Sequence, residues 1–233
     1  MQKILLKFNG VELRLNIRDE ADQSVMREIF KFREYKSAEE SIFVAKDPIL
    51  DIGAHVGFFS MYCRALNPKV KIFAVEPASE NLEMLNSHIK ENKLKNIIVA
   101  ECAVSGKTGK RLLEKDEETI NYRLSPKFAD LKKSSSIKTE TYSFKDFCVK
   151  NKIKKVSLMK MDIEGGEYEV LERMAQEDFA LVKFIILEYH NSRSENFREL
   201  ENILRENGFS VQSFPSKFDK SMGFLFAINK RHA

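Results

Sequence analysis

The stretch that decides the fold is Ile49–Ser60, which reads ILDIGAHVGFFS. It begins as a short apolar run that is typical of a buried strand and reaches Asp51. Gly53 and Gly57 then bracket a tight turn, and a helical pattern starts at Phe58. Glycine lets a backbone approach a ligand closely, and the start of a helix presents free N–H groups. A strand, a glycine-containing turn and a helix in this order predict a nucleotide-binding corner.

The residues of this corner indicate which nucleotide it suits. A dinucleotide fingerprint that begins at Gly53 requires glycine at position 55 and a small residue at position 58, where this chain has His55 and Phe58. This argues against a nicotinamide oxidoreductase. The Asp-x-Gly-x-x-x-Gly turn is instead the pattern of S-adenosylmethionine (SAM) methyltransferases of the Rossmann-like class. A second strand, Phe73–Val75, is followed by Glu76, whose carboxylate is placed to accept hydrogen bonds from both ribose hydroxyls.

Two later stretches carry a closer resemblance. Residues 99–105 read VAECAVS, and residues 158–171 read LMKMDIEGGEYEVL. Together with residues 50–54 and 75–77, they resemble the FkbM family of SAM-dependent methyltransferases, over a region from about Asp47 to about His190. The Lys-x-Asp-x-Glu-Gly-x-Glu run is the most specific part. His55 departs from the asparagine that the family more often has, although both side chains donate a hydrogen bond.

Length and composition set the remaining bounds. The chain has 233 residues, 43% of them hydrophobic, which suits one α/β domain. No apolar run approaches the roughly 20 residues that span a bilayer, and the charged N-terminus is not a secretory signal. Cys63, Cys102 and Cys148 are widely spaced, which predicts reduced, buried thiols in a cytoplasmic protein. The net charge of +4 is too small to indicate a nucleic-acid partner.

Residues 1–46 form an extension before the predicted SAM-binding domain, 47–233. Apolar and polar residues alternate around Asn9-Gly10, which predicts a hairpin of Lys3–Lys7 and Glu12–Ile17. Asp19 or Asp22 then caps a helix that runs to about Tyr35. This extension either lies over the mouth of the site, extends the sheet or simply packs against the domain.

From residue 49 the chain alternates strand and helix. This predicts an α/β fold of the Rossmann-like class I methyltransferase type: a seven-stranded, mostly parallel sheet with helices on both faces. The last two strands leave no room for a helix between them, so they form an antiparallel C-terminal hairpin, which a plain dehydrogenase domain lacks. The predicted strands are Ile49–Ile52, Lys71–Val75, Ile97–Glu101, Ser157–Met161, Lys183–Tyr189, Phe209–Phe214 and Gly223–Asn229. The predicted helices are about Gly57–Ala65, Ser79–Asn92, Phe144–Asn151, Gly166–Gln176 and Ser194–Asn207.

Residues 107–141 break the alternation and are rich in charge and serine, above all at Lys132–Ser136. They are interpreted as a solvated loop or exposed hairpin, or as a mobile flap over the acceptor.

The predicted cofactor pocket follows the strand ends. Glu76 takes the ribose, the residues after it flank it, the turn holds or orders the methionine portion, and the segment after the third strand lies by the adenine. The predicted cofactor-binding residues are Asp51, Gly53, Ala54, His55, Val56, Gly57, Phe58, Glu76, Pro77, Asn81, Cys102, Ala103, Val104 and Asp162.

Methyl transfer is an in-line displacement at carbon, so the protein must align two reactants and remove a proton from a neutral acceptor. Asp162 ends the fourth parallel strand, beside the predicted site of the reacting methyl. Glu188 and His190 project to one side of the next strand. Because histidine titrates near neutrality, His190 is the candidate base, with Asp162 and Glu164 as alternatives.

Two questions stay open at this edge. The acids and His190 are of types that suit Mg²⁺, Mn²⁺ or a transition metal, yet acids gather at strand ends without metal, and no metal site is predicted. Glu167 points either into the pocket or into the first turn of a helix, where its charge complements the helix dipole.

The resemblance implies O-methylation of a small-molecule or sugar-like hydroxyl. The alternatives are an RNA or protein methyltransferase and a non-catalytic module that binds SAM or a nucleotide on the same fold. We expect a small-molecule acceptor, no membrane and no nucleic-acid partner. The acceptor and the oligomeric state are not predicted.

Overall fold

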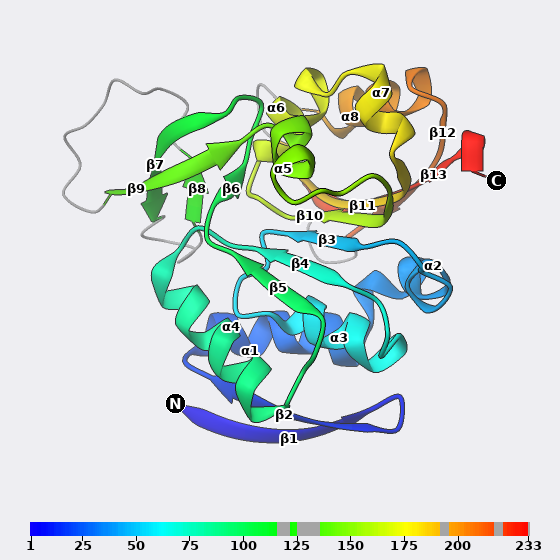
Figure 1. Cartoon of the computed structure of the whole chain (residues 1–233). Helices are drawn as coiled ribbons and strands as arrows, with labels where there is room; N and C mark the ends of the chain where they lie inside the picture. The colour runs from blue at the N-terminus through cyan, green and yellow to red at the C-terminus, as the bar shows by residue number, and fades with distance from the viewer. Residues whose placement is uncertain (116–121, 125–135, 192–195, 217–220, 233) are drawn as a thin grey trace.

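A computed structural model of the chain describes residues 1–115, 122–124, 136–191, 196–216 and 221–232 (Figure 1). A seven-stranded sheet forms its centre, in the order β12-β13-β11-β10-β3-β4-β5. Five strands are parallel, whereas β13 is antiparallel to both β11 and β12. The predicted sheet and its C-terminal hairpin are confirmed. The strands are β3 (Ile49–Ile52), β4 (Ile72–Val75), β5 (Ile97–Ala100), β10 (Val156–Met161), β11 (Val182–His190), β12 (Phe209–Pro215) and β13 (Met222–Asn229).

Helices cover both faces of this sheet because its central strands are buried on both sides (Figure 1). One face packs against α3 (Phe58–Leu66) and α4 (Ser79–Glu91), and the other against α5 to α8. No helix within the described ranges is long and apolar enough to cross a membrane. The second face is covered by α5 (Phe144–Lys150), α6 (Gly166–Arg173), α7 (Gln176–Ala180) and α8 (Phe197–Glu206), and the short η3 (Lys230–His232) ends the chain.

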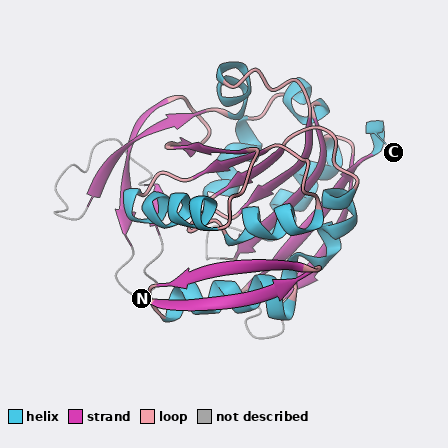
Figure 2. Ribbon diagram, turned by 60° about the horizontal axis from the view of Figure 1, so that its bottom comes forward, coloured by secondary structure: helices cyan, strands magenta, loops and turns pink. Residues whose placement is uncertain are grey.

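The N-terminal hairpin forms a sheet of its own and does not extend the main one (Figure 2). Strands β1 (Gln2–Phe8) and β2 (Val11–Ile17) pair antiparallel around the predicted turn, where Gly10 has φ +77°. The backbone N–H of Asn16 donates to Nε2 of His88 at 2.8 Å, which ties β2 to α4. The hairpin therefore lies against the helical layer of the domain.

The helix predicted to reach Tyr35 ends earlier. Asp19 caps α1 (Glu20–Met26), and a π-helical segment, η1 (Arg27–Phe32), continues it. Arg33 then adopts φ +54°, a left-handed conformation that ends the helix before η2 (Glu34–Ala38) and α2 (Glu39–Phe43). Buried apolar side chains of this segment share one core with α3 and the sheet, so residues 1–46 are packed as part of the same body.

Of the structures expected for 107–141, its described part forms a hairpin rather than a solvated loop, and with β6 its strands make a second, four-stranded sheet in the order β6-β9-β7-β8. Leu112 and Leu113 of β7 are buried, so each face of this strand has an apolar contact. Residues 116–121 and 125–135 of the proposed flap lie outside the described residues. The strands are β6 (Ala103–Val104), β7 (Gly109–Lys115), β8 (Tyr122–Leu124) and β9 (Ser136–Tyr142).

Two other helix boundaries differ from the prediction. The helix expected over 166–176 ends at Arg173, because Met174 is extended, and α7 follows as a separate turn. The last helix begins at Phe197, where the side chain of Asn196 accepts a hydrogen bond from the backbone of Arg198. Its predicted start at residues 194–195 lies outside the described part.

Gly53 is required where β3 and β10 come closest. Its φ is +77°, and a Cβ at this position would lie 1.9 Å from the carbonyl oxygen of Asp162. No side chain fits at that distance, so the turn after β3 is pressed against the end of β10. This contact brings the ends of the two strands together.

We predict that Gly53→Ala destabilises the fold by about 1–3 kcal/mol more than Gly10→Ala, as measured by urea denaturation. Gly10 is a matched control because it has the same φ of +77° but nothing within 4 Å of its Cβ position. It therefore reports the left-handed conformation alone, which costs about 1–2 kcal/mol. Equal losses in the two variants would mean that the contact with Asp162 does not constrain the turn.

Candidate functional site

A cavity of about 920 Å³ opens at the carboxyl ends of the parallel strands. The turns after β3, β4 and β10 line it, together with the end of β11, part of the second sheet and the segment α1–η2. Most of the predicted site residues meet there. Those that line the cavity are Gly53, Ala54, His55, Phe58, Glu76, Pro77, Asn81, Ala103, Val104, Asp162, Glu164 and His190.

Four predicted cofactor-binding residues lie behind the cavity lining instead. Asp51 is buried and accepts a hydrogen bond from Oγ of Ser60 at 2.6 Å. The carbonyl of Val56 bonds Nδ1 of His88, and Gly57 leaves room for Leu85, whose Cδ1 would lie 2.3 Å from an added Cβ. These three order the turn and its packing on α4.

The fourth is Cys102, which is buried and whose thiol has a pKa raised by burial to about 11. Cys63 and Cys148 are buried and unbridged as well, which fits the predicted reduced thiols.

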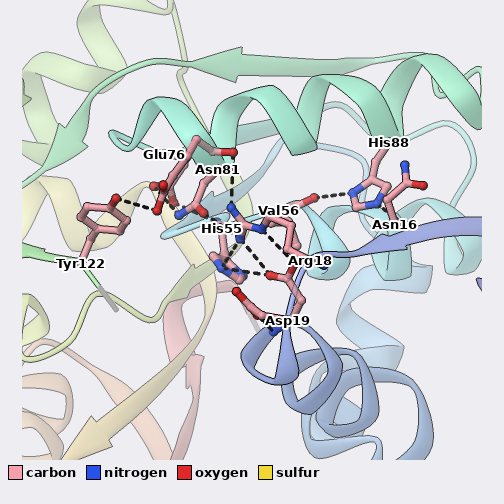
Figure 3. A network of polar contacts seen from close by, with 11 residues as sticks. Asn16, Arg18, Asp19, His55, Val56, Glu76, Asn81, His88 and Tyr122 are labelled. Carbon is pink, nitrogen blue, oxygen red and sulfur yellow. Dashed lines mark hydrogen bonds and ion pairs between the residues drawn. The ribbon is translucent and has the colours of Figure 1, made fainter. Parts of the chain in front are cut away.

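Glu76 is held in place before any ligand arrives (Figure 3). Its side chain is buried, and its Oε1 accepts from the backbone N–H of Ala78 at 2.9 Å and from Nδ2 of Asn81 at 3.2 Å. Its Oε2 accepts from the backbone N–H of His55 at 2.9 Å. A carboxylate has about four acceptor positions, so one position on Oε2 remains. Glu76 is therefore preoriented and can accept one further hydrogen bond, whereas its place at a strand end suggested one from each ribose hydroxyl.

The turn and α4 are joined by a group from the N-terminal segment (Figure 3). Nη2 of Arg18 donates to Oδ1 of Asn81 at 3.0 Å and lies 3.2 Å from Nε2 of His55. The same guanidinium binds the buried carboxylate of Asp22 at 2.8 and 2.9 Å. His55 itself has φ +50°, in the left-handed region where asparagine and histidine are enriched.

Lys160 is the most consequential residue that the sequence prediction missed. Its side chain is only 4% exposed, although it lines the cavity, and its Nζ donates to the carbonyl of Gly53 at 2.7 Å. Nζ also lies 3.5 Å from Oδ1 of Asp51 and 3.4 Å from Oδ2 of Asp162. Burial lowers the pKa of Lys160, but the two carboxylates outweigh it and the net shift is upward. A lysine within an otherwise apolar strand was the available signal.

The acids at the end of the sheet are not equivalent. Burial acts to raise the pKa of Asp162, but Lys160 and His190 outweigh it and hold the pKa below its usual value. Burial, and then the charge of Asp162, raise the pKa of Glu188 well above its usual value. Asp162 is therefore the ionised member of this pair and Glu188 the protonated one.

His190 and Glu164 face each other across the cavity edge, with 4.0 Å between Nε2 and Oε2. Nδ1 of His190 is buried and has no hydrogen-bond partner in the part of the chain that the structure describes. Glu188 and His190 both line the cavity, as the period of two along β11 predicts.

Glu167 does not line the cavity. Its buried carboxylate accepts from the backbone N–H groups of Ile163 and Gly165, at 2.6 and 2.9 Å, and so closes the turn after β10. Burial raises its pKa to about 8. Of the two predicted positions for Glu167, the structure shows the one in the first turn of helix α6. Its carboxylate bonds the backbone of the turn that precedes the helix.

The N-terminal segment supplies part of the cavity wall. The ring of Tyr35 packs against Phe59 and Phe224, with centroids 4.8 and 5.1 Å apart, and Glu34 beside it has a pKa raised by burial to about 7. Both residues line the cavity. Of the three placements considered for residues 1–46, the helical segment takes the one over the site, whereas the hairpin simply packs against the domain. Among the described residues, no group of three or more His, Cys, Asp or Glu side chains is arranged to hold a metal ion.

The family model described as the methyltransferase FkbM domain matches residues 51–211. The chain belongs to this family. Its relatives include methyltransferase sdnD of Sordaria araneosa, which is 24% identical over 220 residues, covering 81% of this chain and 82% of that protein. The 31-O-demethyl-FK506 methyltransferase FkbM of Streptomyces tacrolimicus is 24% identical over 216 residues, covering 81% of this chain and 82% of that protein.

Solved structures agree on the fold of this FkbM-family chain. Aeropyrum pernix fibrillarin, solved with natively bound SAM, has a TM-score of 0.53 at 13% identity, covering 97% of this chain and 82% of that one. An rRNA methylase from Streptococcus thermophilus has a TM-score of 0.53 at 7% identity, covering 84% and 96%. At these identities the likeness shows the fold, which is that of class I methyltransferases.

Family and fold together make the chain a SAM-dependent methyltransferase. The residues present suit this cofactor. The cavity is in the size range of small-molecule sites, and Glu76 at the end of β4 keeps an acceptor position. Asp162 is an ionised acid at the end of β10, which is separated from β4 by β3 alone. These groups and the turn at Gly53 line one cavity, as the predicted corner requires.

We predict that Lys160→Met costs about 3–5 kcal/mol of stability at pH 7, because it leaves the carboxylates of Asp51 and Asp162 without their buried counter-charge. The pKa of Asp162 is below its usual value in the folded protein, so its contribution is present above the usual pKa and lost as pH falls through the folded value. In the variant the pKa of Asp162 is raised by burial instead, so the deficit is largest above that raised pKa and shrinks as pH falls from it toward the lowered pKa of the wild type.

Urea denaturation at pH 7 and pH 4 measures this difference. Lys155→Met is the control, because this lysine is exposed just before the same strand. A Lys160→Met deficit that is the same at both pH values would contradict the assigned pairing.

Proposed function

We propose that this methyltransferase transfers the methyl group of SAM to a hydroxyl oxygen of a small molecule. One observation carries the proposal: Glu76, the turn at Gly53 and Asp162 line one cavity, which also contains His190. The name of the Streptomyces relative describes methylation of an oxygen on a small molecule, which supports the same acceptor class here. The test is transfer of label from methyl-tritiated SAM to hydroxyl compounds, with 31-O-demethyl-FK506 as the first trial acceptor. The proposal fails if labelled product forms only with RNA or protein.

The cofactor is placed along the strand ends. Glu76 accepts a hydrogen bond from a ribose hydroxyl at its remaining position on Oε2, and Ala103 and Val104 lie by the adenine. His55 and the backbone of Gly53 face the methionine portion, and Asp162 is beside its amino group. When bound, SAM supplies an electrophilic methyl, and transfer forms an oxygen–carbon bond as the carbon–sulfur bond breaks.

His190 is the proposed base, because the other candidates are less suited to accept a proton. Asp162 has a lowered pKa and Glu188 is protonated, so neither takes a proton readily near neutrality. Nδ1 of His190 has no hydrogen-bond partner among the described residues, and Oε2 of Glu164 lies 4.0 Å from Nε2, near enough to stabilise the protonated imidazole. The proton of the acceptor hydroxyl passes to His190, while Asp162 stays ionised opposite Lys160.

We infer a cytoplasmic location from the three buried, unbridged cysteines, and no nucleic-acid partner from the small net charge. We treat residues 1–46 as an extension that completes the site of the 47–233 domain, since its helical segment lines the cavity.

We predict that Glu76→Gln weakens SAM binding about 10- to 100-fold by calorimetry, because the amide replaces an ionised acceptor that contacts the ribose. Glu101→Gln is the matched control, since this acid follows the neighbouring strand β5 but is exposed. Equal affinities of the wild type and Glu76→Gln would remove Glu76 from the cofactor site.

His190→Ala should lower turnover about 10²- to 10⁴-fold, the usual contribution of a general base, with SAM affinity unchanged. The readout is formation of S-adenosylhomocysteine in the presence of a competent hydroxyl acceptor. His232→Ala serves as the control, because this histidine contacts the carbonyl of Ala180, away from the cavity lining. Turnover that survives in His190→Ala would transfer the role to Asp162 or Glu164.

A further inference from the structure

Arg18 is the point at which the N-terminal segment meets the cofactor turn (Figure 3). It lies outside residues 51–211, which the family model matches. Its guanidinium is engaged on both sides: Nε and Nη2 bind Asp22, while Nη2 also reaches His55 and Asn81. Its side chain is 25% exposed, so these contacts are partly shielded from water. One planar group therefore contacts the first turn of α1, the turn after β3 and the start of α4.

The contact with Arg18 decides which ring nitrogen of His55 carries the proton. Nη2 has two N–H bonds for three neighbouring acceptors, Oδ1 of Asp22 at 2.8 Å, Oδ1 of Asn81 at 3.0 Å and Nε2 of His55 at 3.2 Å, so at least one N–H is shared between two of them. Because an arginine donates and does not accept, Nε2 of His55 is the acceptor in this shared contact. Burial lowers the pKa of His55 to about 4, so the ring is neutral near pH 7. A neutral ring that accepts at Nε2 carries its proton on Nδ1.

The other charged groups near the ring do not reverse this assignment. Oδ1 of Asp22 lies 3.6 Å from Nε2, but this carboxylate is already bound by Arg18 on both oxygens. Asp162 and Lys160 also act on His55, with opposite effects on its charge. The ring lines the cavity with 32% of its side chain exposed, and no described residue accepts a hydrogen bond from Nδ1. That N–H is left for a ligand.

Arg18 also orients Asn81. Because Oδ1 of Asn81 accepts from Nη2, its Nδ2 is turned toward Oε1 of Glu76, at 3.2 Å. Two of the three donors to Glu76 are the backbone N–H of His55 and the amide of Asn81. The side chains of both residues contact the guanidinium of Arg18.

We propose that Arg18 is a positioning residue of the cofactor site: it fixes His55 as an Nδ1–H donor toward the carboxylate of the methionine portion, and fixes the amide of Asn81 toward Glu76. This rests on the placement of SAM given above. The ligand group recognised through His55 is an anionic carboxylate, and a neutral imidazole N–H suits it as a hydrogen-bond donor.

The test compares two ligands that differ in the amino-acid portion, which carries that carboxylate. S-adenosylhomocysteine carries the amino-acid portion, whereas 5′-methylthioadenosine lacks it. Calorimetry on Arg18→Met should show affinity for S-adenosylhomocysteine reduced about tenfold more than affinity for 5′-methylthioadenosine, the loss of one charge-assisted hydrogen bond. Arg14→Met is the control, because Arg14 lies on β2, four residues before Arg18, with an exposed side chain, and it should leave both affinities unchanged. Equal losses for the two ligands in Arg18→Met, or no loss, would overturn the proposal.

A second variant isolates the tautomer. Asparagine at position 55 tolerates the left-handed backbone and donates through its amide without help from Arg18. In the His55→Asn background, Arg18→Met should therefore lose at least threefold less affinity for S-adenosylhomocysteine than in the wild type. An undiminished loss would mean that Arg18 does not act through His55.

The tautomer is also read directly, without a ligand. ¹⁵N NMR of the imidazole, assigned with His55→Asn, should show Nδ1 protonated in the wild type and a mixture of tautomers in Arg18→Met. Arg18→Lys keeps the charge beside Asp22 if Arg18→Met does not fold, and its single ammonium should also release His55. A wild-type proton on Nε2 would overturn the proposal. Absence of any ligand binding by the wild type would instead refute the cofactor placement, and the NMR result would still decide the role of Arg18.

Discussion

The site depends on one buried ammonium group between two strands. Lys160 and Asp51 are directly paired in the register of β10 and β3, and Nζ of Lys160 also binds the carbonyl of Gly53. A lysine buried without counter-charge would lose its proton, so Asp51 and Asp162 are needed to keep it charged. In return, the ammonium fixes Asp162 and the turn relative to each other. The same group thus stabilises the core and sets the distance between the cofactor turn and the reacting end of β10.

The parts that the sequence predicted share a simple physical origin. Parallel strands end at one edge of a sheet, so Asp51, Glu76 and Asp162 had to lie near one another once the strands were recognised. The glycine turn and the period of two along β11 then placed His55 and His190 on the cavity side. Strand ends are local features, and sequence patterns report them well.

The parts that it missed depend on contacts between distant segments. Nothing local indicates that Glu167 turns back to the N–H groups of Ile163 and Gly165, or that Asp51 faces Ser60 instead of a ligand. The full second sheet was missed because its strands carry many charged residues, and the two buried leucines of β7, Leu112 and Leu113, are adjacent and do not form an alternating pattern. The end of the N-terminal helix at Arg33 followed from a left-handed φ that arginine rarely adopts, so no pattern predicted it.

Position 55 shows how backbone and side-chain constraints combine. A φ of +50° between two glycines restricts the residue to the few side chains that tolerate it, and asparagine and histidine are among them. Asparagine has one fixed donor group, whereas a neutral histidine can carry its proton on either of two ring nitrogens, so its surroundings must select the tautomer. A histidine here therefore needs a neighbour that only donates, and Arg18 is such a neighbour. Arg18 thus gives this histidine a fixed donor nitrogen, which asparagine has in its own amide.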